Sequence, residues 1–519
     1  MDVGTLVARS TRKYRDRIAV ESSEGAMTFG EIGSRIFQLA RGLKALGLAP
    51  GDRVLDLQSN QRTYIETDLG ISTAGLCRVA LNYRLHPNDW VRITNDCGAK
   101  VLIMDAKFWD ESAPVRELVD HIILIHGEHD GTTPYEAFLA KQESHAFSTA
   151  IDPDSFVSLN YSSGTTGNPK GAIRTHRNRT ASLNNIITDI FGRIPNETDC
   201  WVHAGPVTHT SGLFVLPYFT FGAKQIVLAK YDPEEFIDVI QNRGGNATAL
   251  VPTMVARLLA VDGITKEKMA NLRMLGYAGA PMPPDQIKQC HEKITTKMVQ
   301  YYGLVEAIPP VTVLSEADHA LGLSQNPELL TSAGNPCVGV EILIVDENGK
   351  EVPVGEIGEV ITRGDHVMRG YYGAAGQDAT VTKAVRDGWL HTGDLGRIDE
   401  DNRLYLVDRK GDMIISGGYN IYPREIEDVI AEIPEVLEVA VMGIHDVEWG
   451  QRVTAMVTLV PNTTVDHAEL TTRILEHCKS RMASYKKPKD LRIVAEFPLN
   501  STGKIAKKVL KQQLEAEGK

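Results

Sequence analysis

Short hydrophobic runs rich in β-branched residues alternate along most of the chain with longer segments in which apolar residues recur every three or four positions. The short runs predict strands, and the longer segments predict helices. Clear predicted strands are KVLIM (100–104), HIILI (121–125), SFVSL (155–159), QIVL (225–228) and TALV (248–251). Alternation of strands with helices is typical of layered α/β architecture. We therefore expect an α/β fold over most of the chain.

The pattern changes after DRKGD at residues 408–412. From there the sequence predicts a smaller α+β arrangement, with helices at 425–433 and 469–482 and strands at 439–444 and 453–460. A segment of about 110 residues is long enough to form a domain of its own. We therefore predict a separate small C-terminal domain.

Composition narrows the possible functions only slightly. The chain has 519 residues, of which 42% are hydrophobic and 24% are charged, so it is too long for one simple core and otherwise typical of a globular protein. Its formal net charge is −12. An acidic protein repels polyanions, so we expect no general affinity for nucleic acid. An anionic ligand would need a local pocket.

The cysteines and the N-terminus bear on the compartment. The six cysteines form neither a CxxC pair nor a metal-binding spacing with histidine, so we expect reduced and mostly buried thiols. They are Cys77, Cys97, Cys200, Cys290, Cys337 and Cys478. The first residues carry charges where a secretory signal needs an apolar run, and no stretch approaches the roughly 20 apolar residues of a membrane span. We expect a cytoplasmic protein without stable membrane insertion.

The stretch from Ser162 to Gly171 (SSGTTGNPKG) follows a predicted strand and concentrates hydroxyls, glycines and one lysine. Glycines let backbone N–H groups form an anion-binding nest. The hydroxyls of Thr165 and Thr166 can donate to phosphate oxygens, and Lys170 adds positive charge. The stretch lacks the GxxxxGK[ST] pattern of a Walker A loop. It predicts a phosphate-binding loop, with a flexible surface turn as the alternative on composition alone.

Three other residues suit nucleotide chemistry. Glu306 lies in a YGxxE run between a predicted strand end and a proline-rich turn, and its carboxylate oxygens suit Mg²⁺. Asp394, beside glycine in HTGDLG, can accept hydrogen bonds from two ribose hydroxyls. Lys504 follows a Ser-Thr-Gly turn and can stabilise charge on phosphate and carboxylate oxygens. Taken singly, each also has an ordinary explanation as a solvated, turn or surface residue.

Together these stretches resemble the adenylate-forming superfamily, which includes acyl-CoA synthetases, luciferases and the adenylation domains of peptide synthetases. The loop at 162–171 has the form of the signature of that family. Six further matches follow in order: PVTHTSG (206–212), GYAGAPM (276–282), QYYGLVEA (300–307), GWLHTGDLG (388–396), VDRKGDMIISGGYNIYPREIE (407–427) and PLNSTGKIAKK (498–508). The matches cover nearly the whole chain.

The resemblance implies a set of site residues. Tyr302 would stack on adenine, and Asp394 would bind the ribose with Arg409 as its companion. The expected residues for ATP and coenzyme A are Ser162, Ser163, Gly164, Thr165, Thr166, Gly167, Lys170, Gly279, Ala280, Pro281, Tyr301, Tyr302, Gly303, Asp394, Arg409, Gly417, Gly418 and Tyr419. The expected catalytic residues are Lys504, Glu306, Thr166 and His209, and Glu306 and Thr166 are the expected Mg²⁺ ligands.

The resemblance also implies a domain organisation. Residues 1–408 would bind AMP and the acyl group, 409–411 would be a hinge, and 412–519 would form a small mobile domain carrying the catalytic lysine. Rotation about the hinge would withdraw Lys504 and bring Gly417 and Gly418 to the pantetheine tunnel of coenzyme A.

Two positions depart from the family pattern. Val305 stands where the family usually has a threonine whose hydroxyl contacts phosphate, and valine cannot donate a hydrogen bond. Gly411 stands at the hinge position, which often carries lysine or aspartate; glycine widens the φ/ψ range of a rotating hinge.

The acyl group is the least determined part of the prediction. His209 lies where the family has an aromatic residue or histidine lining the acyl tunnel, although a histidine satisfied within its loop is an alternative. The expected pocket residues are Val207, Thr208, His209, Gly212, Leu213, Ala278, Gly279 and Ile308. These apolar or small residues suit a fatty, aryl or alicyclic acid without further charge. The motif lacks the aspartate by which amino-acid-activating members bind an ammonium group.

The resemblance implies an ATP-dependent acyl-CoA synthetase, which forms an acyl-AMP and pyrophosphate and then transfers the acyl group to coenzyme A. One alternative is an acyl-AMP ligase that loads the phosphopantetheine of a carrier protein. A second is a catalytically silent acyl- or nucleotide-binding homologue, which Val305 makes conceivable. A homodimer is an expectation at the level of the family only.

Overall fold

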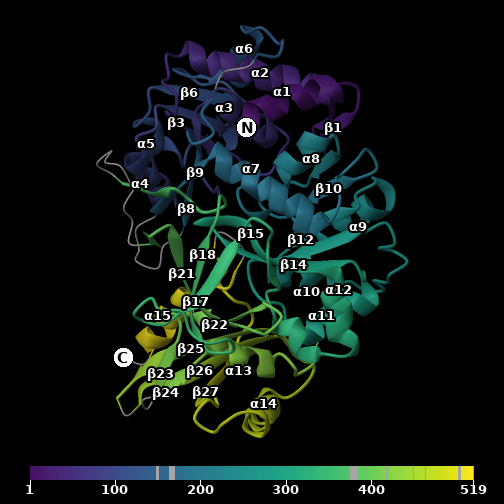
Figure 1. Cartoon of the computed structure of the whole chain (residues 1–519), viewed down its shortest axis with the longest axis vertical. Coiled ribbons are helices and arrows are strands. Elements are labelled where there is room, and N and C mark those ends of the chain that lie inside the picture. Colours follow the sequence, from purple (N-terminus) through teal and green to yellow (C-terminus); the bar gives the residue numbers. More distant parts are fainter. Residues whose placement is uncertain are drawn as a thin grey trace.

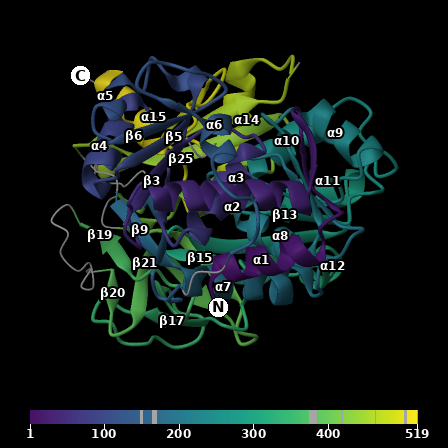
Figure 2. The same cartoon turned by 90° about the horizontal axis from the view of Figure 1, so that it is seen from above.

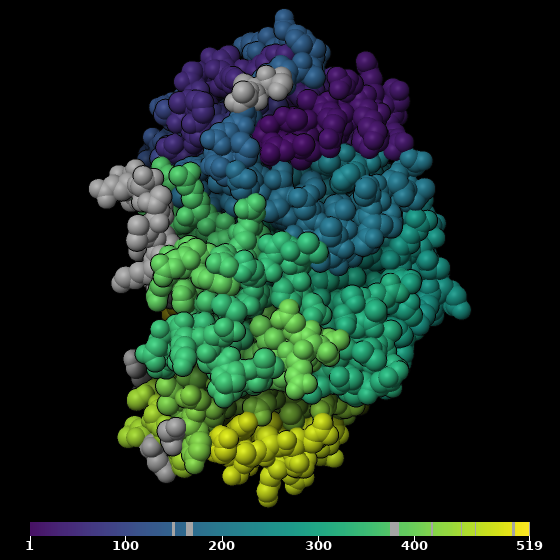
Figure 3. All heavy atoms as spheres, in the orientation of Figure 1, coloured from purple at the N-terminus to yellow at the C-terminus, as the bar shows by residue number. Residues whose placement is uncertain are grey.

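The computed structural model describes residues 1–147, 151–162, 170–373, 384–416, 419–447, 449–461, 463–500 and 504–517. In Figure 1 the N-terminal third of the chain lies at the upper end, the middle third lies below and beside it, and the residues after 412 form the lower end. The space-filling view in Figure 3 shows this lower part in contact with the body above it.

A sheet of eight strands within the described residues forms the upper body, in the order β19-β9-β8-β4-β3-β5-β6-β7. Its strands are β3 (Arg53–Leu57), β4 (Cys77–Ala80), β5 (Val101–Asp105), β6 (His121–Ile125), β7 (Thr133–Pro134), β8 (Phe156–Ser162), β9 (Lys170–Thr175) and β19 (Gly370–Tyr372). The pairs from β8 through β4, β3, β5 and β6 to β7 are parallel, whereas β9 runs antiparallel to both β8 and β19.

Helices cover both faces of this sheet, as buried parallel strands require. Val54 and Leu55 are adjacent on β3 and point to opposite faces, one into a core with α2, α3 and α6 and the other into a core with α4. These helices are α2 (Phe29–Ala45), α3 (Thr63–Thr73), α4 (Pro87–Cys97) and α6 (Tyr135–Ala140), with the short α5 (Ala113–Arg116) beside α4. Helix α1 (Val3–Lys13) packs on α2 and α3 (Figure 2).

A second sheet, of nine strands in the described part, has the order β16-β15-β14-β13-β12-β10-β11-β1-β2. Its strands are β1 (Ile18–Ser22), β2 (Gly25–Thr28), β10 (Cys200–His203), β11 (Lys224–Val227), β12 (Ala247–Leu250), β13 (Met274–Tyr277), β14 (Met298–Leu304), β15 (Ala307–Leu314) and β16 (Asn335–Pro336). One face packs on α9 (Pro233–Asn242), α10 (Pro252–Leu259) and α11 (Pro284–Lys293). The remaining helices of this region are α7 (His176–Asn185), α8 (Val215–Phe221) and α12 (Glu316–Ser324).

A smaller antiparallel sheet follows the two large ones and supplies part of the candidate site. It consists of β17 (Glu341–Val345), β18 (Gly358–Arg363), β20 (Val385–Arg386), β21 (Trp389–Ile398) and β22 (Leu404–Arg409). On β21 and β22, Asp394 lies opposite Arg409 in the register.

The chain after β22 forms the predicted α+β arrangement. Strands β25 (Val436–Asp446), β26 (Gly450–Leu459) and β27 (Asp490–Ile493) form one sheet, and β23 (Ile414–Ser416) pairs with β24 (Tyr419–Ile421). Helices α13 (Pro423–Ile430) and α14 (His467–Arg481) pack on one core, and α15 (Lys507–Glu517) packs on another. The predicted layered α/β body with a small α+β C-terminal part is confirmed.

The predicted strands and cysteines agree with the structure. The strand predicted at 121–125 is β6, and that at 225–228 is β11 displaced by one residue. All six cysteines are free and buried. One local expectation was wrong: the prolines after Glu306 do not form a turn but lie inside β15. They are tolerated there because the pairing of β14 with β15 is irregular between Tyr302 and Leu304 of β14. The stretch of β15 that contains the prolines therefore needs no regular backbone hydrogen bonds to its partner strand.

Candidate active site

Three residues predicted for nucleotide binding meet where the nine-stranded sheet adjoins the smaller antiparallel sheet. Tyr302 on β14 donates a hydrogen bond from its hydroxyl to Asp394 Oδ2 at 2.5 Å. Arg409 Nε lies 3.3 Å from Asp394 Oδ1. Burial raises the pKa of Asp394, whereas Arg409 and the tyrosine hydroxyl favour the ionised carboxylate. The cluster therefore combines the aromatic ring of Tyr302, a carboxylate that can accept hydrogen bonds from hydroxyl groups, and the guanidinium of Arg409.

Lys504 reaches this cluster from the C-terminal part of the chain. Its position is set by Asn500: the Asn500 backbone N–H donates to the Lys504 carbonyl at 2.7 Å, and the Lys504 N–H donates to Asn500 Oδ1 at 3.0 Å. A Cβ atom built on Gly279 would lie 3.3 Å from Lys504 Cε, so the aliphatic stem of the lysine crosses that glycine. Gly279 has a φ of +88°, which favours glycine for conformational reasons as well.

The ammonium group of Lys504 lies in an unusual environment. Burial, together with the positive charge of Arg409, lowers the pKa of Lys504 to about 8, although Asp394 acts in the opposite direction. Lysine normally titrates near 10.4. The side chain is therefore mostly charged at neutral pH and loses its charge under mildly alkaline conditions.

Glu306 lies with Val305 in the two-residue turn between β14 and β15. The hydroxyl of Tyr371 on β19 donates to Glu306 Oε1 at 2.5 Å. Lys170, at the start of β9, places its Nζ 5.4 Å from the centre of the Tyr371 ring. One tyrosine thus connects the carboxylate predicted to bind Mg²⁺ with the lysine of the predicted phosphate loop.

Part of the predicted site lies outside the described residues. Ser162 is the last residue of β8 and Lys170 is the first of β9. The residues outside are Ser163, Gly164, Thr165, Thr166 and Gly167 of the phosphate loop, and Gly417 and Gly418. Their predicted roles stay predictions.

Most of the predicted acyl-binding residues line one cavity of about 70 Å³. They are Val207, Thr208, His209, Gly212, Leu213 and Ile308. Gly212 is required by close packing, because a Cβ atom there would lie 2.2 Å from the carbonyl oxygen of Val207. The PVTHTSG segment folds back on itself here, with the Gly212 N–H donating to the His209 carbonyl at 2.9 Å, and it forms one wall of the cavity.

His209 lies in that wall as a neutral imidazole. Asn82 Nδ2 is 2.9 Å from His209 Nε2, so the amide donates and the ring nitrogen accepts. Burial lowers the pKa of His209 to about 4, and the positive charges of Lys504, Arg84 and Arg174 act in the same direction. His209 therefore offers a polar edge to the cavity without adding charge at neutral pH.

Other predicted site residues lie apart from the cavity. Tyr301 neighbours Tyr302 on β14 and points to the opposite face, where its ring meets Phe214 edge-on at 5.9 Å. Ala278 is buried in the same core. Gly303 packs against Pro309: a Cβ atom built on Gly303 would lie 2.7 Å from Pro309 Cγ. The remaining ones, Ala280, Pro281 and Tyr419, are exposed.

Four residues with evident roles were not assigned a function from sequence. Asn82 and Arg174 lie far from PVTHTSG in the chain and join it only through the fold. Asn82 forms a hydrogen bond with His209, and Arg174 lines the same cavity. Tyr371 of one sheet contacts Glu306 in the turn between β14 and β15 of another. Asn500 lies within the PLNSTGK match, so its position beside Lys504 was the one available signal.

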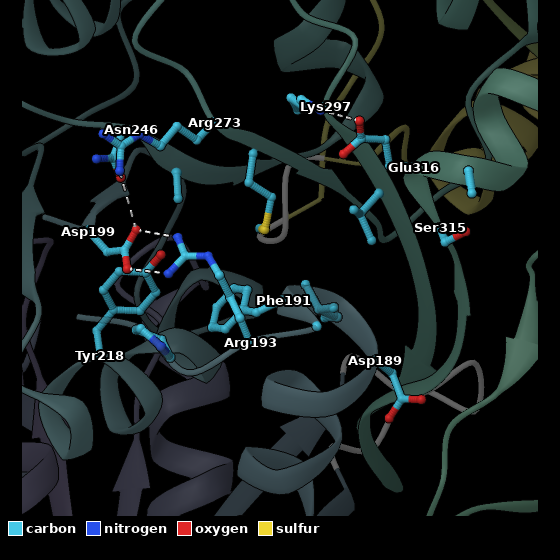
Figure 4. A pocket seen from close by; sticks show the side chains of 17 residues that line it. Asp189, Phe191, Arg193, Asp199, Tyr218, Asn246, Arg273, Lys297, Ser315 and Glu316 are labelled. Atoms are coloured by element: carbon cyan, nitrogen blue, oxygen red, sulfur yellow. Dashed lines mark hydrogen bonds and ion pairs between the residues drawn. The ribbon is translucent and has the colours of Figure 1, made fainter.

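A larger cavity, of about 280 Å³, lies elsewhere, among the N-terminal ends of β12, β13 and β14 (Figure 4). It is lined by three basic and three acidic side chains, and ion pairs join Arg193 to Asp199 at 2.5 Å and Lys297 to Glu316. Because its charges are balanced and it contains none of the predicted site residues, we do not assign it to the active site.

No helix within the described residues is both long and apolar enough to cross a membrane. No group of three or more histidine, cysteine, aspartate or glutamate side chains is arranged there to hold a metal ion.

Comparison with known proteins agrees with this geometry. Residues 7–372 match the family model described as AMP-binding enzyme, and residues 425–504 match the AMP-binding enzyme C-terminal domain. The medium/long-chain-fatty-acid–CoA ligase FadD8 of Mycobacterium tuberculosis is 31% identical, over 98% of this chain and 89% of its own length. Feruloyl-CoA synthase of an Amycolatopsis species is 33% identical over 97% of both chains. Among solved structures, ATP-bound MatB from Rhodopseudomonas palustris is 28% identical in sequence. Its crystal structure aligns over 100% of both chains with a TM-score of 0.86.

The fold and the family matches define an enzyme that activates carboxylic acids with ATP. The chain belongs to the AMP-binding enzyme family, within its acyl-CoA ligase branch. It is an AMP-forming acid–thiol ligase, which uses ATP and coenzyme A to convert a small carboxylic acid into its acyl-CoA.

Proposed function

We propose that the structure corresponds to the adenylate-forming state of this acyl-CoA synthetase and that Lys504 is its catalytic lysine. The observation that carries the proposal is the position of Lys504, whose stem crosses Gly279 and whose ammonium group lies in the field of Asp394 and Arg409. A lysine carried by the C-terminal part meets the nucleotide cluster only when that part is docked as it is here.

In the first half-reaction the acid carboxylate attacks the α-phosphorus of ATP, and pyrophosphate leaves. Tyr302 offers its ring to the adenine, and Asp394 accepts hydrogen bonds from the ribose with Arg409 beside it. Lys504 stabilises the negative charge that develops on the phosphate and carboxylate oxygens. Because its pKa is already lowered, deprotonation of Lys504 would remove this stabilisation within a mildly alkaline range.

The residues present fit a magnesium ion that stays largely hydrated. Mg²⁺ commonly uses one or two carboxylates, with waters and substrate phosphates completing its octahedron. Glu306 offers such a carboxylate, already hydrogen-bonded by Tyr371, and Thr166 is the second predicted ligand. The ion would neutralise phosphate charge when bound. Tyr371 would hold Glu306 in orientation, since its hydroxyl already contacts one of the two carboxylate oxygens.

For the second half-reaction we propose that residues 412–519 rotate relative to residues 1–408 about a hinge at 409–411. A Cβ atom on Gly411 would meet no atom within 4 Å, so this position has open space around it. The small domain also exposes aromatic side chains: Tyr419 stacks on Tyr485 at 4.5 Å, and Lys489 lies over the Trp449 ring. An exposed surface of this kind suits a face that becomes covered after rotation.

Asp408 contributes to the docked position. Its carboxylate accepts hydrogen bonds from the backbone N–H groups of Arg409 at 2.7 Å and of Arg424 at 3.3 Å. Arg424 is in the first turn of α13, so the last strand before the hinge is bound to a helix of the small domain. Burial raises the pKa of Asp408 to about 6. The docked surroundings therefore disfavour the ionised carboxylate, so acidification through this range would favour the docked arrangement.

We propose a compact hydrophobic acid as the substrate. The cavity of about 70 Å³ has apolar wall residues such as Val207 and Leu213. At about 10–15 Å³ of this volume for each water molecule, the space corresponds to about five waters. That suits a short or single-ring acyl group better than an extended long chain.

The test is acid-dependent release of pyrophosphate from ATP and Mg²⁺ across short fatty, aryl and alicyclic acids, with and without coenzyme A. We expect release with at least one compact acid and faster turnover with coenzyme A, with the acyl-CoA detected by mass spectrometry. Release without any acyl transfer to coenzyme A would contradict coenzyme A as the acceptor. No release with any acid would contradict acid activation itself.

A further inference from the structure

The inner face of the hairpin formed by β8 and β9 is unexpectedly polar. Ser158 pairs with Arg174, and Asn160 pairs with Ala172, so Ser158, Asn160 and Arg174 share one face of the hairpin. All three line the cavity assigned to the acyl group. A strand face inside a domain is normally apolar, and polar groups placed there are normally hydrogen-bonded.

Arg174 is incompletely satisfied. Within the part of the chain that the structure describes, its guanidinium has one hydrogen bond, from Nη2 to the Val305 carbonyl at 3.0 Å. Its Nε is buried and has no partner among these residues. An arginine carries five N–H donors, so most of this group's hydrogen-bonding capacity is unused. The Thr208 hydroxyl, which lines the same cavity, is also buried without a partner there.

The other arginines of the cavity are compensated, and they provide an internal comparison. Arg78 lies 2.6 Å from Asp56 and 3.4 Å from Asp68, and Arg179 lies 2.8 Å from Asp68. Two arginines therefore share two carboxylates. Among the described residues, no carboxylate forms an ion pair with Arg174, and His209 is neutral. The cavity thus retains one uncompensated positive charge.

Arg174 is partly buried, and leaving its guanidinium without an ionic partner there is unfavourable. Burial lowers the pKa of Arg174 to about 10, although the nearby Glu306 partly opposes this effect. The group is still charged at neutral pH, and buried charges are normally paired. A ligand oxygen placed in the cavity would supply the missing partner, because carboxylate and carbonyl oxygens match the donor geometry of arginine.

We propose that the acid activated by this enzyme carries a second oxygen acceptor, a carboxylate or a ketone, on its hydrophobic skeleton, and that Arg174 binds it. The apolar wall of Val207 and Leu213 takes the skeleton, and Arg174 recognises the substituent. This inference rests on the proposed function, because it assigns the acyl group to the cavity beside His209. A carboxylate is bound more strongly than a ketone, since its hydrogen bonds to arginine are charge-assisted.

The test compares matched acids in the pyrophosphate assay with the full-length protein. One series is hexanoate, its keto analogue and adipate; the other is cyclohexanecarboxylate with its keto and dicarboxylate derivatives. We expect kcat/KM to be about 10- to 100-fold higher for at least one acceptor-bearing acid than for its plain counterpart. The ketone and carboxylate arms identify which acceptor the site prefers.

The variants Arg174→Met and Arg174→Lys assign this preference to Arg174. We expect the methionine variant to reduce the kcat/KM ratio between paired acids to near one and the lysine variant to restore part of it. Arg92→Met on the exposed face of α4 is the matched control and should keep the wild-type ratio. Thermal unfolding of each variant is measured beside the assay, and the comparison is made between acids on the same folded variant.

Three outcomes would overturn the proposal: equal kcat/KM for paired acids in the wild type, an unchanged kcat/KM for both acids in Arg174→Met, or an equal loss for both acids in that variant. The last would mean that Arg174 serves the reacting carboxylate or ATP. Failure of the wild type to release pyrophosphate with any acid would instead overturn the proposed function on which this inference depends.

Discussion

The aliphatic stem of Lys504 crosses the backbone of Gly279, and a Cβ atom on that glycine would lie 3.3 Å from the lysine Cε. The two residues are 225 positions apart in sequence (504 − 279), one in the C-terminal part and one after β13. Their contact is possible only while the C-terminal part is docked on the body, so it reports on the state that the structure represents.

Gly279→Val tests this contact. The branched side chain would occupy the path of the lysine stem, and the φ of +88° is strained for any β-branched residue. We expect acyl-adenylate formation to fall about 10- to 100-fold, because displacement of a catalytic group by about 1 Å has effects of that size. Acyl transfer from supplied acyl-adenylate to coenzyme A should fall much less. Equal losses in the two half-reactions would show that the substitution damages the site generally.

The pH dependence of adenylation should report Lys504. Its pKa is lowered to about 8, so the protonated and active form is lost as the pH rises through that value. We expect kcat/KM for ATP to fall above about pH 8. In Lys504→Arg any remaining activity should lack this fall, because arginine stays protonated. A falling limb with the same midpoint in the arginine variant would assign the titration to another group.

Val305→Thr should improve the use of ATP. The turn between β14 and β15 places residue 305 beside Glu306, and a threonine there would offer a hydroxyl that valine lacks. One added hydrogen bond corresponds to about a two- to tenfold lower KM for ATP. Val305→Ala removes the branched side chain without adding a donor and serves as the control. If threonine and alanine have the same effect, the hydroxyl is not responsible.

Asp394→Asn should weaken ATP binding. The substitution removes the charge that faces Arg409 and replaces one acceptor oxygen with a donor, while the Tyr302 hydroxyl can still bond to the amide oxygen. We expect KM for ATP to rise about tenfold or more, as for loss of a hydrogen bond to a charged group. An unchanged KM would contradict a ribose-binding role. Deoxy-ATP, which lacks one ribose hydroxyl, supplies the complementary measurement. The factor by which KM for deoxy-ATP exceeds KM for ATP should be smaller in the variant than in the wild type.

Gly411→Pro tests the proposed hinge. Proline fixes φ near −65° and restricts the preceding residue, so a rotation at this position would be hindered. We expect adenylation to continue and acyl transfer to coenzyme A to slow. Gly411→Ala has open space for its Cβ and should behave nearly as the wild type. Slowing of adenylation alone would place the moving residues elsewhere.

The sequence was most informative where a function depends on a contiguous segment. The run at 121–125 alone predicted β6, since four consecutive apolar residues after His121 leave no competing helical pattern. Asp394, Tyr302 and Arg409 were found by resemblance, and the structure brings all three together. The prolines after Glu306 misled the prediction, because a sheet irregularity accommodates them within a strand.

Contacts between distant segments were beyond the sequence. No motif singled out Arg174, and only the register of β8 against β9 places it on the cavity face. Tyr371 meets Glu306 only because the fold brings β19 beside the turn between β14 and β15, a contact that no local pattern predicts. The predicted pocket of apolar and small residues described one wall; the charged residues on the other side come from α3, β4, α7 and β9.

The most direct test of the central claim separates the two half-reactions in Lys504→Ala. Pyrophosphate release is measured with ATP and an activated acid, and acyl transfer is measured with supplied acyl-adenylate and coenzyme A. Lys479→Ala, on an exposed position of α14, is the control. We predict that Lys504→Ala lowers adenylation about 100-fold or more and leaves acyl transfer largely intact. Wild-type adenylation in this variant would contradict the assignment of Lys504 as the catalytic lysine.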